Sequence, residues 1–155
     1  MEPVAKLAKE LKTQYGVAAI GYSVDITKES KVAANTHEIL DKFGNIDALV
    51  NNAGISPKLE DQSRMDSLKT PMEVWREVFQ VNFFAPIMLA RGLADALNKG
   101  PGAIVNVTSI AGSRVHGFAG TAYATSKAAL AALTREMASD FGPLGVRVNA
   151  IAPGE

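Results

Sequence analysis

Tyr123 and Lys127 lie four positions apart, a spacing that could support proton transfer. On a helix two such side chains share one face, with Cβ atoms about 5–6 Å apart. A lysine ammonium beside a phenol stabilises the phenolate and lowers the pKa of the phenol from about 10. A tyrosine poised in this way could exchange a proton with an alcohol or carbonyl oxygen near neutral pH. The alternative interpretation is an ordinary solvated pair on a helix surface.

Polar and small residues follow four apolar segments of the chain, at the point where each segment ends. Asp25 and Ile26 follow the first segment, and Ser109 follows the third. The second segment ends in Asn51-Asn52-Ala53-Gly54, and the fourth ends in Asn149-Ala150-Ile151-Ala152-Pro153-Gly154. Turn formation alone also explains Asn, Asp and Gly at strand ends, so no single cluster identifies a site.

The elements that must position these residues alternate between short apolar runs and longer stretches of helical periodicity. Strands are expected at residues 17–24, 46–50, 103–108 and 146–151. Helices are expected at the N-terminus, after Thr27, over 71–99 and over 122–141. The strand segments lack clear alternation, which is typical of strands buried on both faces. This order predicts an α/β fold, with a parallel sheet and helices on both faces, whose ligands bind beyond the carboxyl ends of the strands.

Capping residues set the expected helix boundaries. Thr27 is expected to cap the second helix, and Gly44 is expected to end it in a left-handed conformation. Thr70 and Pro71 match the cap and first position of the third helix. The face of the second helix expected to pack inward carries Val32, Thr36, Ile39, Leu40 and Phe43.

Pro86 is expected to disturb the long helix over 71–99. In an α-helix the N–H of each residue bonds the carbonyl four positions earlier, and proline has no N–H. The carbonyl of Asn82 would therefore lack its usual partner and leave a kink with a free acceptor. Such an acceptor could hold a water for proton relay, although a kink that serves only packing is the alternative.

Composition restricts the class of protein. The 155 residues suffice for one domain, and 16 basic and 16 acidic residues give a net charge of zero. A neutral surface argues against nucleic acid or a membrane as a partner. The absence of cysteine and the separation of His37 from His116 argue against a metal site. With no signal-like segment at the start, these features predict a cytoplasmic protein.

Five motifs in order resemble the short-chain dehydrogenase/reductase family. The likeness covers nearly the whole chain and rests on Asn51-Asn52-Ala53-Gly54, Asn82, Ser109, the Tyr123 to Lys127 spacing, and 149–154. The resemblance implies a Rossmann-like fold and an NAD(P)-dependent oxidoreductase that acts on a small-molecule alcohol or ketone. NAD and NADP remain equally open as the cofactor.

The resemblance also implies residue roles. Tyr123 would be the general acid/base, and Lys127 would support it and hydrogen-bond the nicotinamide ribose. Ser109 would hold the substrate oxygen, as an oxyanion donor does. Asn82 would hold a relay water. The cofactor-binding residues would be Tyr123, Lys127, Asp25, Ile26, Asn52, Ala53, Gly54, Pro153 and Gly154.

The chain departs from the family pattern at both ends. The glycine-rich loop that holds the cofactor diphosphate at a helix N-terminus is not found, and no lid segment follows 153–154. Residues 1–155 therefore read as one partial Rossmann-type domain that contains the third to sixth strands of the family. Weakened cofactor binding is the expected consequence.

Loss of the family's first two strands would also bare one edge of the strand at 46–50. An apolar strand with an unpaired edge is a template for association. Either residues 17–24 pair with this edge, giving a four-stranded order of family strands 3-4-5-6, or two chains pair to cover it.

Two functions compete. One is an oxidoreductase, favoured by the presence of Asn82, Ser109, Tyr123 and Lys127. The other is a catalytically inactive remnant that acts as an oligomerising or interaction module; a dinucleotide-binding module without catalysis is a weaker third. In the family the helices at 71–99 and 122–141 form subunit contacts, which implies a homo-oligomer. His116 and Phe118 are candidates for lining a substrate pocket, with simple exposure as the alternative.

Overall fold

The sheet of the computed structural model, which describes residues 2–154, is parallel and three-stranded. Its strands are β1 (Ala48–Asn51), β2 (Ala103–Val107) and β3 (Arg147–Ile151), in the order β1-β2-β3. Ala48 pairs with Ala103, and Ala103 pairs with Arg147, so the first residues of the three strands are in register. Their carboxyl ends consequently meet at one edge, and the predicted α/β class with a parallel sheet is confirmed.

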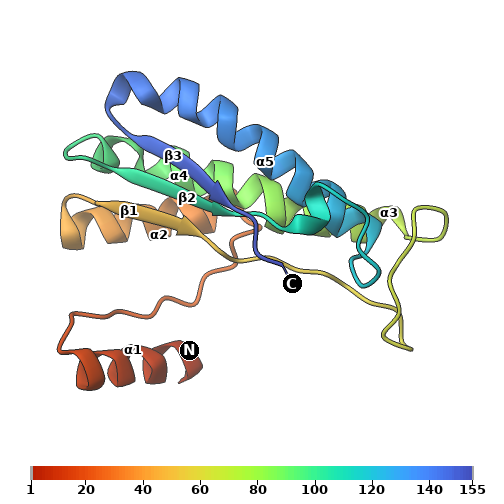
Figure 1. Ribbon diagram of the computed structural model, residues 1–155. Helices are drawn as coiled ribbons and strands as arrows, with labels where there is room; N and C mark the ends of the chain where they lie inside the picture. Colours follow the sequence, from red (N-terminus) through yellow and green to blue (C-terminus); the bar gives the residue numbers. More distant parts are fainter. Residues whose placement is uncertain (1, 155) are drawn as a thin grey trace.

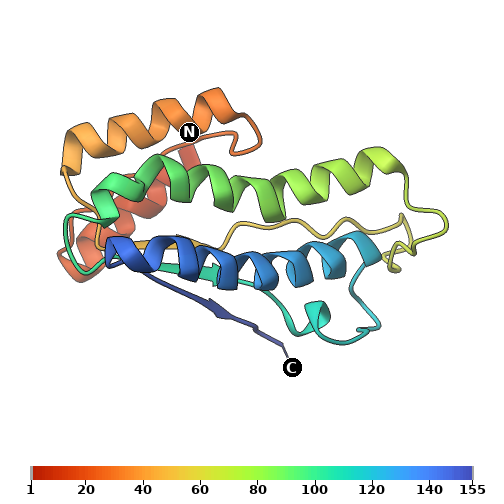
Figure 2. The ribbon, with the colours of Figure 1, turned by 90° about the horizontal axis from the view of Figure 1, so that it is seen from above.

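Helices α4 and α5 pack against one face of this sheet, and α2 packs along α4 (Figures 1 and 2). Helix α1 lies on the opposite side of the sheet (Figure 1). None of the helices within residues 2–154 combines the length and apolar character required to span a bilayer. The helical elements are α1 (Glu2–Tyr15), α2 (Glu29–Phe43), α3 (Met72–Phe79), a π turn (Gln80–Phe84), α4 (Ala85–Leu97), a 3-10 turn (Ile110–Gly112), α5 (Thr121–Phe141) and a second 3-10 turn (Gly142–Leu144).

The core lies between the sheet and helices α4 and α5. Leu97 of α4 and Ile104 of β2 are fully buried at its centre. Successive residues of a strand point to opposite faces, so Ile104 and Asn106 face the helices while Val105 and Val107 face away. The remaining buried members are Ala90, Leu93, Met137, Val146 and Val148.

The strand expected at residues 17–24 does not form. This segment runs extended from α1 towards α2 without a ladder partner among the described residues (Figure 1). It also does not pair with β1, so the four-stranded order was wrong. The segment packs on α1 instead, where a Cβ on Gly21 would collide with the Val4 carbonyl. An apolar extended run needs a neighbouring strand to hydrogen-bond, and periodicity alone does not reveal whether one is available. Pairing between two chains remains a prediction.

The two threonine caps were also wrong, for one shared reason. The Thr27 hydroxyl donates to Asp25 Oδ1 at 2.6 Å, and Lys28 takes the cap position of α2. The Thr70 hydroxyl likewise donates backwards, to the Asp66 carbonyl, and α3 starts after Pro71. In both places the hydroxyl satisfies the preceding turn and not the helix that follows.

Helix α2 ends where the sequence predicts, but one residue of its predicted inward face is exposed. Gly44 ends the helix at φ +76°, and its N–H donates to the Leu40 carbonyl at 2.8 Å. Val32 and Thr36 are buried, and Ile39 and Leu40 pack against the core. Phe43 is exposed, which corrects its place on the packed face. It belongs to the last turn of the helix.

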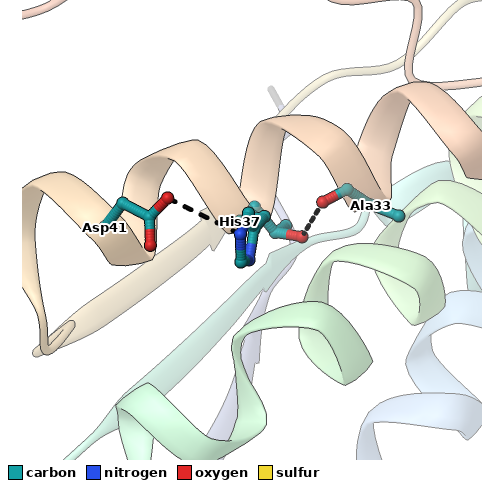
Figure 3. Close-up of polar contacts among 4 residues, drawn as sticks. Ala33, His37 and Asp41 are labelled. Carbon is teal, nitrogen blue, oxygen red and sulfur yellow. Dashed lines mark hydrogen bonds and ion pairs between the residues drawn. The ribbon is translucent and has the colours of Figure 1, made fainter.

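Helices α2 and α4 approach closely at Thr36 and Gly92. The Thr36 hydroxyl donates to the Ala33 carbonyl at 3.0 Å, and the neighbouring His37 lies 3.6 Å from Asp41 (Figure 3). A Cβ on Gly92 would lie 2.8 Å from Thr36 Oγ1 and 3.0 Å from its Cγ2. The absence of a side chain at Gly92 is therefore what lets the two helices meet here.

Gly92→Ala is expected to lower the free energy of unfolding by about 1–2 kcal/mol, because overpacking outweighs the gain in helix propensity. In a Thr36→Ala background the same change is expected to be neutral or stabilising, since the colliding atoms are gone. Urea denaturation of the four proteins measures this coupling. Gly100→Ala is the control, because no atom lies within 4 Å of its added Cβ. Equal effects of Gly92→Ala in both backgrounds would contradict the contact.

Candidate active site

Tyr123 and Lys127 occupy the first half of α5, as their spacing predicts. Lys127 Nζ lies 5.8 Å from the centroid of the Tyr123 ring. The lysine is only 3% exposed, and its Nζ donates to the Val107 carbonyl at 2.6 Å. Burial lowers the pKa of the Lys127 ammonium below its ordinary value. A solvated surface pair is therefore the wrong description, because the lysine is buried beside the end of β2.

Ser109 and Tyr123 line the same pocket, whose volume is about 270 Å³. Ser109 follows β2 and caps the 3-10 turn, its Oγ accepting from the Ala111 N–H at 3.2 Å. His116 and Phe118 line this pocket too, although the Phe118 side chain is 75% exposed. Contact of either residue with a substrate stays a prediction. Two of the residues that line this pocket, Ser109 and Tyr123, carry hydroxyl groups.

Asn82 is fully buried and ties the segment after β1 to α5. Its Oδ1 accepts from the Ile55 N–H at 2.8 Å, and its Nδ2 donates to the Ile55 carbonyl and to Ser126 Oγ, both at 3.0 Å. Ser126 in turn donates to the Tyr123 carbonyl at 2.7 Å. The side chain therefore holds backbone in place; the relay water remains a prediction.

Sequence reasoning missed Ser126, which is fully buried. It lies between Tyr123 and Lys127 in sequence and links their helix to Asn82. A serine inside a helix is usually exposed or bonded to its own helix backbone. Its position next to Lys127, on the buried side of the helix, was the available signal.

The disturbance expected at Pro86 takes the form of a π turn over Gln80–Phe84. The Ala85 N–H donates to the Gln80 carbonyl, five positions back. A π turn adds one residue to the helix, and such turns occur often at functional sites. The break places Asn82 within the turn, with its side chain directed to the segment after β1 and to α5.

Asn52, Ala53 and Gly54 form an exposed stretch of backbone after β1. A Cβ on Gly54 would lie 3.3 Å from both Lys127 Nζ and Asn82 Oδ1. Glycine therefore lets this backbone lie close to the buried Lys127 and Asn82 side chains. Contact of the segment with a cofactor stays a prediction.

Pro153 and Gly154 close the same pocket from the end of β3. Both line the pocket that holds Ser109 and Tyr123, and the Pro153 carbonyl accepts from the Ile110 N–H at 3.1 Å. A Cβ on Gly154 would collide with the Ile110 side chain. The ends of β2 and β3 are thereby joined around the pocket.

Asp25 and Ile26 are not brought to this pocket. Asp25 lines a separate pocket of about 560 Å³ with Thr27 and Gln80. Its Oδ1 accepts from the Thr27 hydroxyl and, at 3.0 Å, from the Thr27 N–H, and these bonds hold the pKa of the Asp25 carboxyl below its ordinary value. Gln80 Nε2 donates to the Thr27 carbonyl at 3.0 Å, which anchors this loop to the π turn. Adenine contact by Asp25 and Ile26 stays a prediction.

Comparison with known proteins gives a consistent result. The sequence profile of the short chain dehydrogenase family matches residues 1–155. Protein FixR of Bradyrhizobium diazoefficiens is 67% identical over 108 residues, which are 70% of this chain and 39% of FixR. The 7alpha-hydroxysteroid dehydrogenase of Escherichia coli K12 is 38% identical over 143 residues, 91% of this chain and 52% of that protein.

Solved structures agree with the sequence relatives. An oxidoreductase of the short chain dehydrogenase/reductase family from Brucella ovis, in complex with a partially ordered NAD, is 68% identical at a TM-score of 0.81. The match covers 85% of this chain and 61% of that one. A gluconate 5-dehydrogenase from Burkholderia cenocepacia, in complex with NADP and tartrate, matches at a TM-score of 0.87 and 29% identity, over 99% of this chain and 57% of its own.

The chain spans about half the length of the relatives it matches, between 39% and 52% for the two curated proteins named above. With its whole length matched by the family profile, the chain belongs to the short-chain dehydrogenase family.

Proposed function

We propose that this chain carries the proton-transfer centre of an NAD(P)-dependent oxidoreductase acting on an alcohol or ketone, with Tyr123 as the general acid/base. The observation that carries the proposal is the shared pocket of Ser109 and Tyr123, with Lys127 buried beside the tyrosine ring. Two hydroxyls and one buried ammonium suit a reaction in which an oxygen gains or loses a proton.

In the direction of reduction, the hydroxyls of Ser109 and Tyr123 hold the ketone oxygen of the substrate. A bound reduced nicotinamide supplies the hydride that the carbonyl carbon accepts. Tyr123 gives its hydroxyl proton to the oxygen, which becomes the alcohol. The Lys127 ammonium then stabilises the phenolate that remains on Tyr123 until solvent returns a proton.

Three groups of this chain would hold the nicotinamide half of the cofactor. The bare backbone at Gly54 lies beside Lys127, and Lys127 Nζ lies 5.8 Å from the centroid of the Tyr123 ring. NAD and NADP stay equally open as the cofactor.

Titration with NADH and with NADPH, followed by cofactor fluorescence, tests the proposal. We expect saturable binding of at least one of them, weakened from micromolar towards millimolar dissociation constants, about −8 to −4 kcal/mol. A Gly54→Val variant is expected to abolish the response, because its side chain would press on Lys127 Nζ and Asn82 Oδ1, each 3.3 Å from an added Cβ. Gly100→Val is the matched control, since no atom lies within 4 Å of its added Cβ. No response to either cofactor at millimolar concentration would contradict the proposal for this chain and favour the inactive remnant.

A homo-oligomer built on α3, α4 and α5 is proposed as well. Met72 at the start of α3 is 58% exposed, and Phe84 at the end of the π turn is 46% exposed. Subunit contacts are marked by contiguous exposed apolar patches, and Met72 and Phe84 are the large apolar side chains exposed on α3 and the π turn.

Phe84→Asp is therefore expected to shift the chain to a lower mass in sedimentation velocity, because a buried carboxylate would destabilise the helix contact. Leu144→Asp, an exposed apolar position in the second 3-10 turn, is the control and should leave the mass unchanged. A monomeric parent chain would contradict the assembly.

A further inference from the structure

The pocket that Ser109 and Tyr123 line carries more polar side chains than one reacting oxygen needs. Ser56, from the segment after β1, and His116, from the loop after β2, line the same pocket. The proposed reaction uses Ser109 and Tyr123 and gives no part to these two residues. The other lining residues are apolar or glycine, namely Ile110, Ala111, Phe118, Ala119, Pro153 and Gly154. A few polar side chains in an otherwise apolar lining are what orient a small ligand.

The imidazole of His116 is held by its own loop. Its Nδ1 accepts from the Phe118 N–H at 3.4 Å, and the centroids of the two rings lie 5.8 Å apart. A ring nitrogen that accepts a hydrogen bond carries no proton, so the proton of the neutral imidazole is on Nε2. The two nitrogens point in different directions, so Nε2–H is directed away from the Phe118 N–H. Within residues 2–154 it donates to no protein atom, which leaves it available to an acceptor oxygen of a ligand.

Ser56 is positioned by the residues on either side of it. Both backbone groups of Ile55 bond to the buried Asn82 side chain, at 2.8 Å and 3.0 Å. The Lys58 ammonium, two residues after Ser56, donates to the Phe118 carbonyl. This bond ties the segment after β1 to the loop after β2, and the two polar side chains that these segments carry therefore line one pocket.

The lining selects against a charged group. No aspartate, glutamate, lysine or arginine lines this pocket in the part of the chain that the structure describes. An ion there would lose its hydration without gaining an oppositely charged partner, which is costly. A hydroxyl group needs only a donor and an acceptor, and a neutral imidazole and a serine provide them. At about 270 Å³ the pocket is also small, so a ligand inside it lies close to all of its walls.

We infer that the substrate of the proposed oxidoreductase is an uncharged hydroxy ketone, or the corresponding diol, whose second oxygen binds between Ser56 and His116. That oxygen accepts from His116 Nε2–H, and its hydroxyl donates to Ser56 Oγ. The inference rests on the proposed function for the reacting oxygen only, since neither residue takes part in proton transfer. A site built to bond a hydroxyl rejects an analogue that lacks it, because the polar groups of the protein are then left unpaired.

Ligands that differ in one group test this inference. The 155-residue chain is titrated without cofactor, at about pH 8 where imidazoles are generally neutral, with cyclohexanones that carry a hydroxyl at ring position two, three or four. Methyl groups at the same positions give matched ligands of similar size, and a carboxylate at position four gives a charged one. Two-dimensional NMR measures dissociation constants independently of turnover. We expect at least one hydroxy ketone to bind about threefold to tenfold more tightly than its methyl counterpart, and the carboxylate to bind most weakly.

Variants of the two side chains locate the effect. His116→Asn and Ser56→Ala are each expected to bring the ratio of hydroxy to methyl affinity close to one. His116→Gln should keep part of the preference, because a glutamine amide can reach the place of Nε2 and an asparagine amide cannot. His37→Asn and Ser63→Ala are the matched controls, since both residues are exposed and neither lines the pocket. The comparison of ligands on the parent chain does not depend on the folding of any variant.

Failure of this inference and failure of the proposed function give different results. Equal binding of hydroxy and methyl ketones, tighter binding of the carboxylate, or no binding of any ligand at tens of millimolar overturns the hydroxy-ketone assignment. If methyl ketones are then reduced in a Tyr123-dependent reaction, the proposed function stands without it. A His116-dependent preference for the hydroxyl with no Tyr123-dependent turnover would instead retain the binding site and overturn the oxidoreductase.

Discussion

Replacement of Tyr123 by phenylalanine is expected to lower the turnover of ketone by about 10²–10⁴-fold, the range that a general acid contributes, while cofactor affinity should change little. The variant keeps the aromatic ring in the pocket that Ser109 also lines, and it loses only the hydroxyl that we propose exchanges the proton. The measurement is the loss of cofactor absorbance under single-turnover conditions, with the fluorescence titration run in parallel.

Tyr15→Phe provides the matched control for this loss. Tyr15 ends α1 and is exposed, so removal of its hydroxyl should leave turnover unchanged. A Tyr123→Phe protein with the parent rate would show that the proton comes from another group, and Ser109 would then be the next candidate. Loss of cofactor binding together with turnover would show that the hydroxyl serves binding and not proton transfer.

Lys127→Met is the second change with a large expected effect. Turnover should fall about 10²–10³-fold, as it does when a preorganised electrostatic donor is removed. The variant also changes how stability depends on pH. Burial lowers the pKa of Lys127 in the folded chain, so between that value and the ordinary lysine pKa of 10.5 the unfolded chain binds more protons than the folded one.

The sign of the pH effect follows from this proton balance. Below the folded-state pKa the buried ammonium opposes folding, and this penalty is relieved as the pH rises towards 10.5. The free energy of unfolding of the parent chain should therefore gain on that of Lys127→Met between neutral pH and about pH 10. Urea denaturation at a series of pH values measures the difference, and the exposed Lys42→Met is the control. A difference that does not vary with pH would contradict a destabilised ammonium at this position.

The chemistry-bearing residues were predictable because their positions depend on local structure. Tyr123 and Lys127 needed only a helix, and Ser109 needed only a strand that ends before it. Gly44 was predictable for the same reason, since a helix end at positive φ favours glycine. The missing N–H of Pro86 made a break in the helix predictable. The form of the break, a π turn, was not predictable, because it depends on what the Asn82 side chain binds.

The predictions that failed depend on hydrogen-bond partners that are distant in sequence, or that precede the residue in the chain instead of following it. Residues 17–24 have the composition of a buried strand, yet strand formation requires a neighbour. Thr27 and Thr70 stand where helix caps belong, yet each hydroxyl satisfies the turn before it. Asp25 follows the apolar run that forms no strand, and it lines a separate pocket, so adenine contact there stays a prediction.

The π turn over Gln80–Phe84 has a consequence for how the gene can vary. Its one-residue excess sets the rotational phase between α3 and α4, because each residue of an α-helix turns the chain by about 100°. Deletion of a single codon within this turn would restore an unbroken α ladder up to Pro86 and swing every preceding side chain around the axis by that angle. Insertions and deletions of single residues should therefore be tolerated near Met72 or Leu97, at the two ends of this helical segment, far better than between these residues.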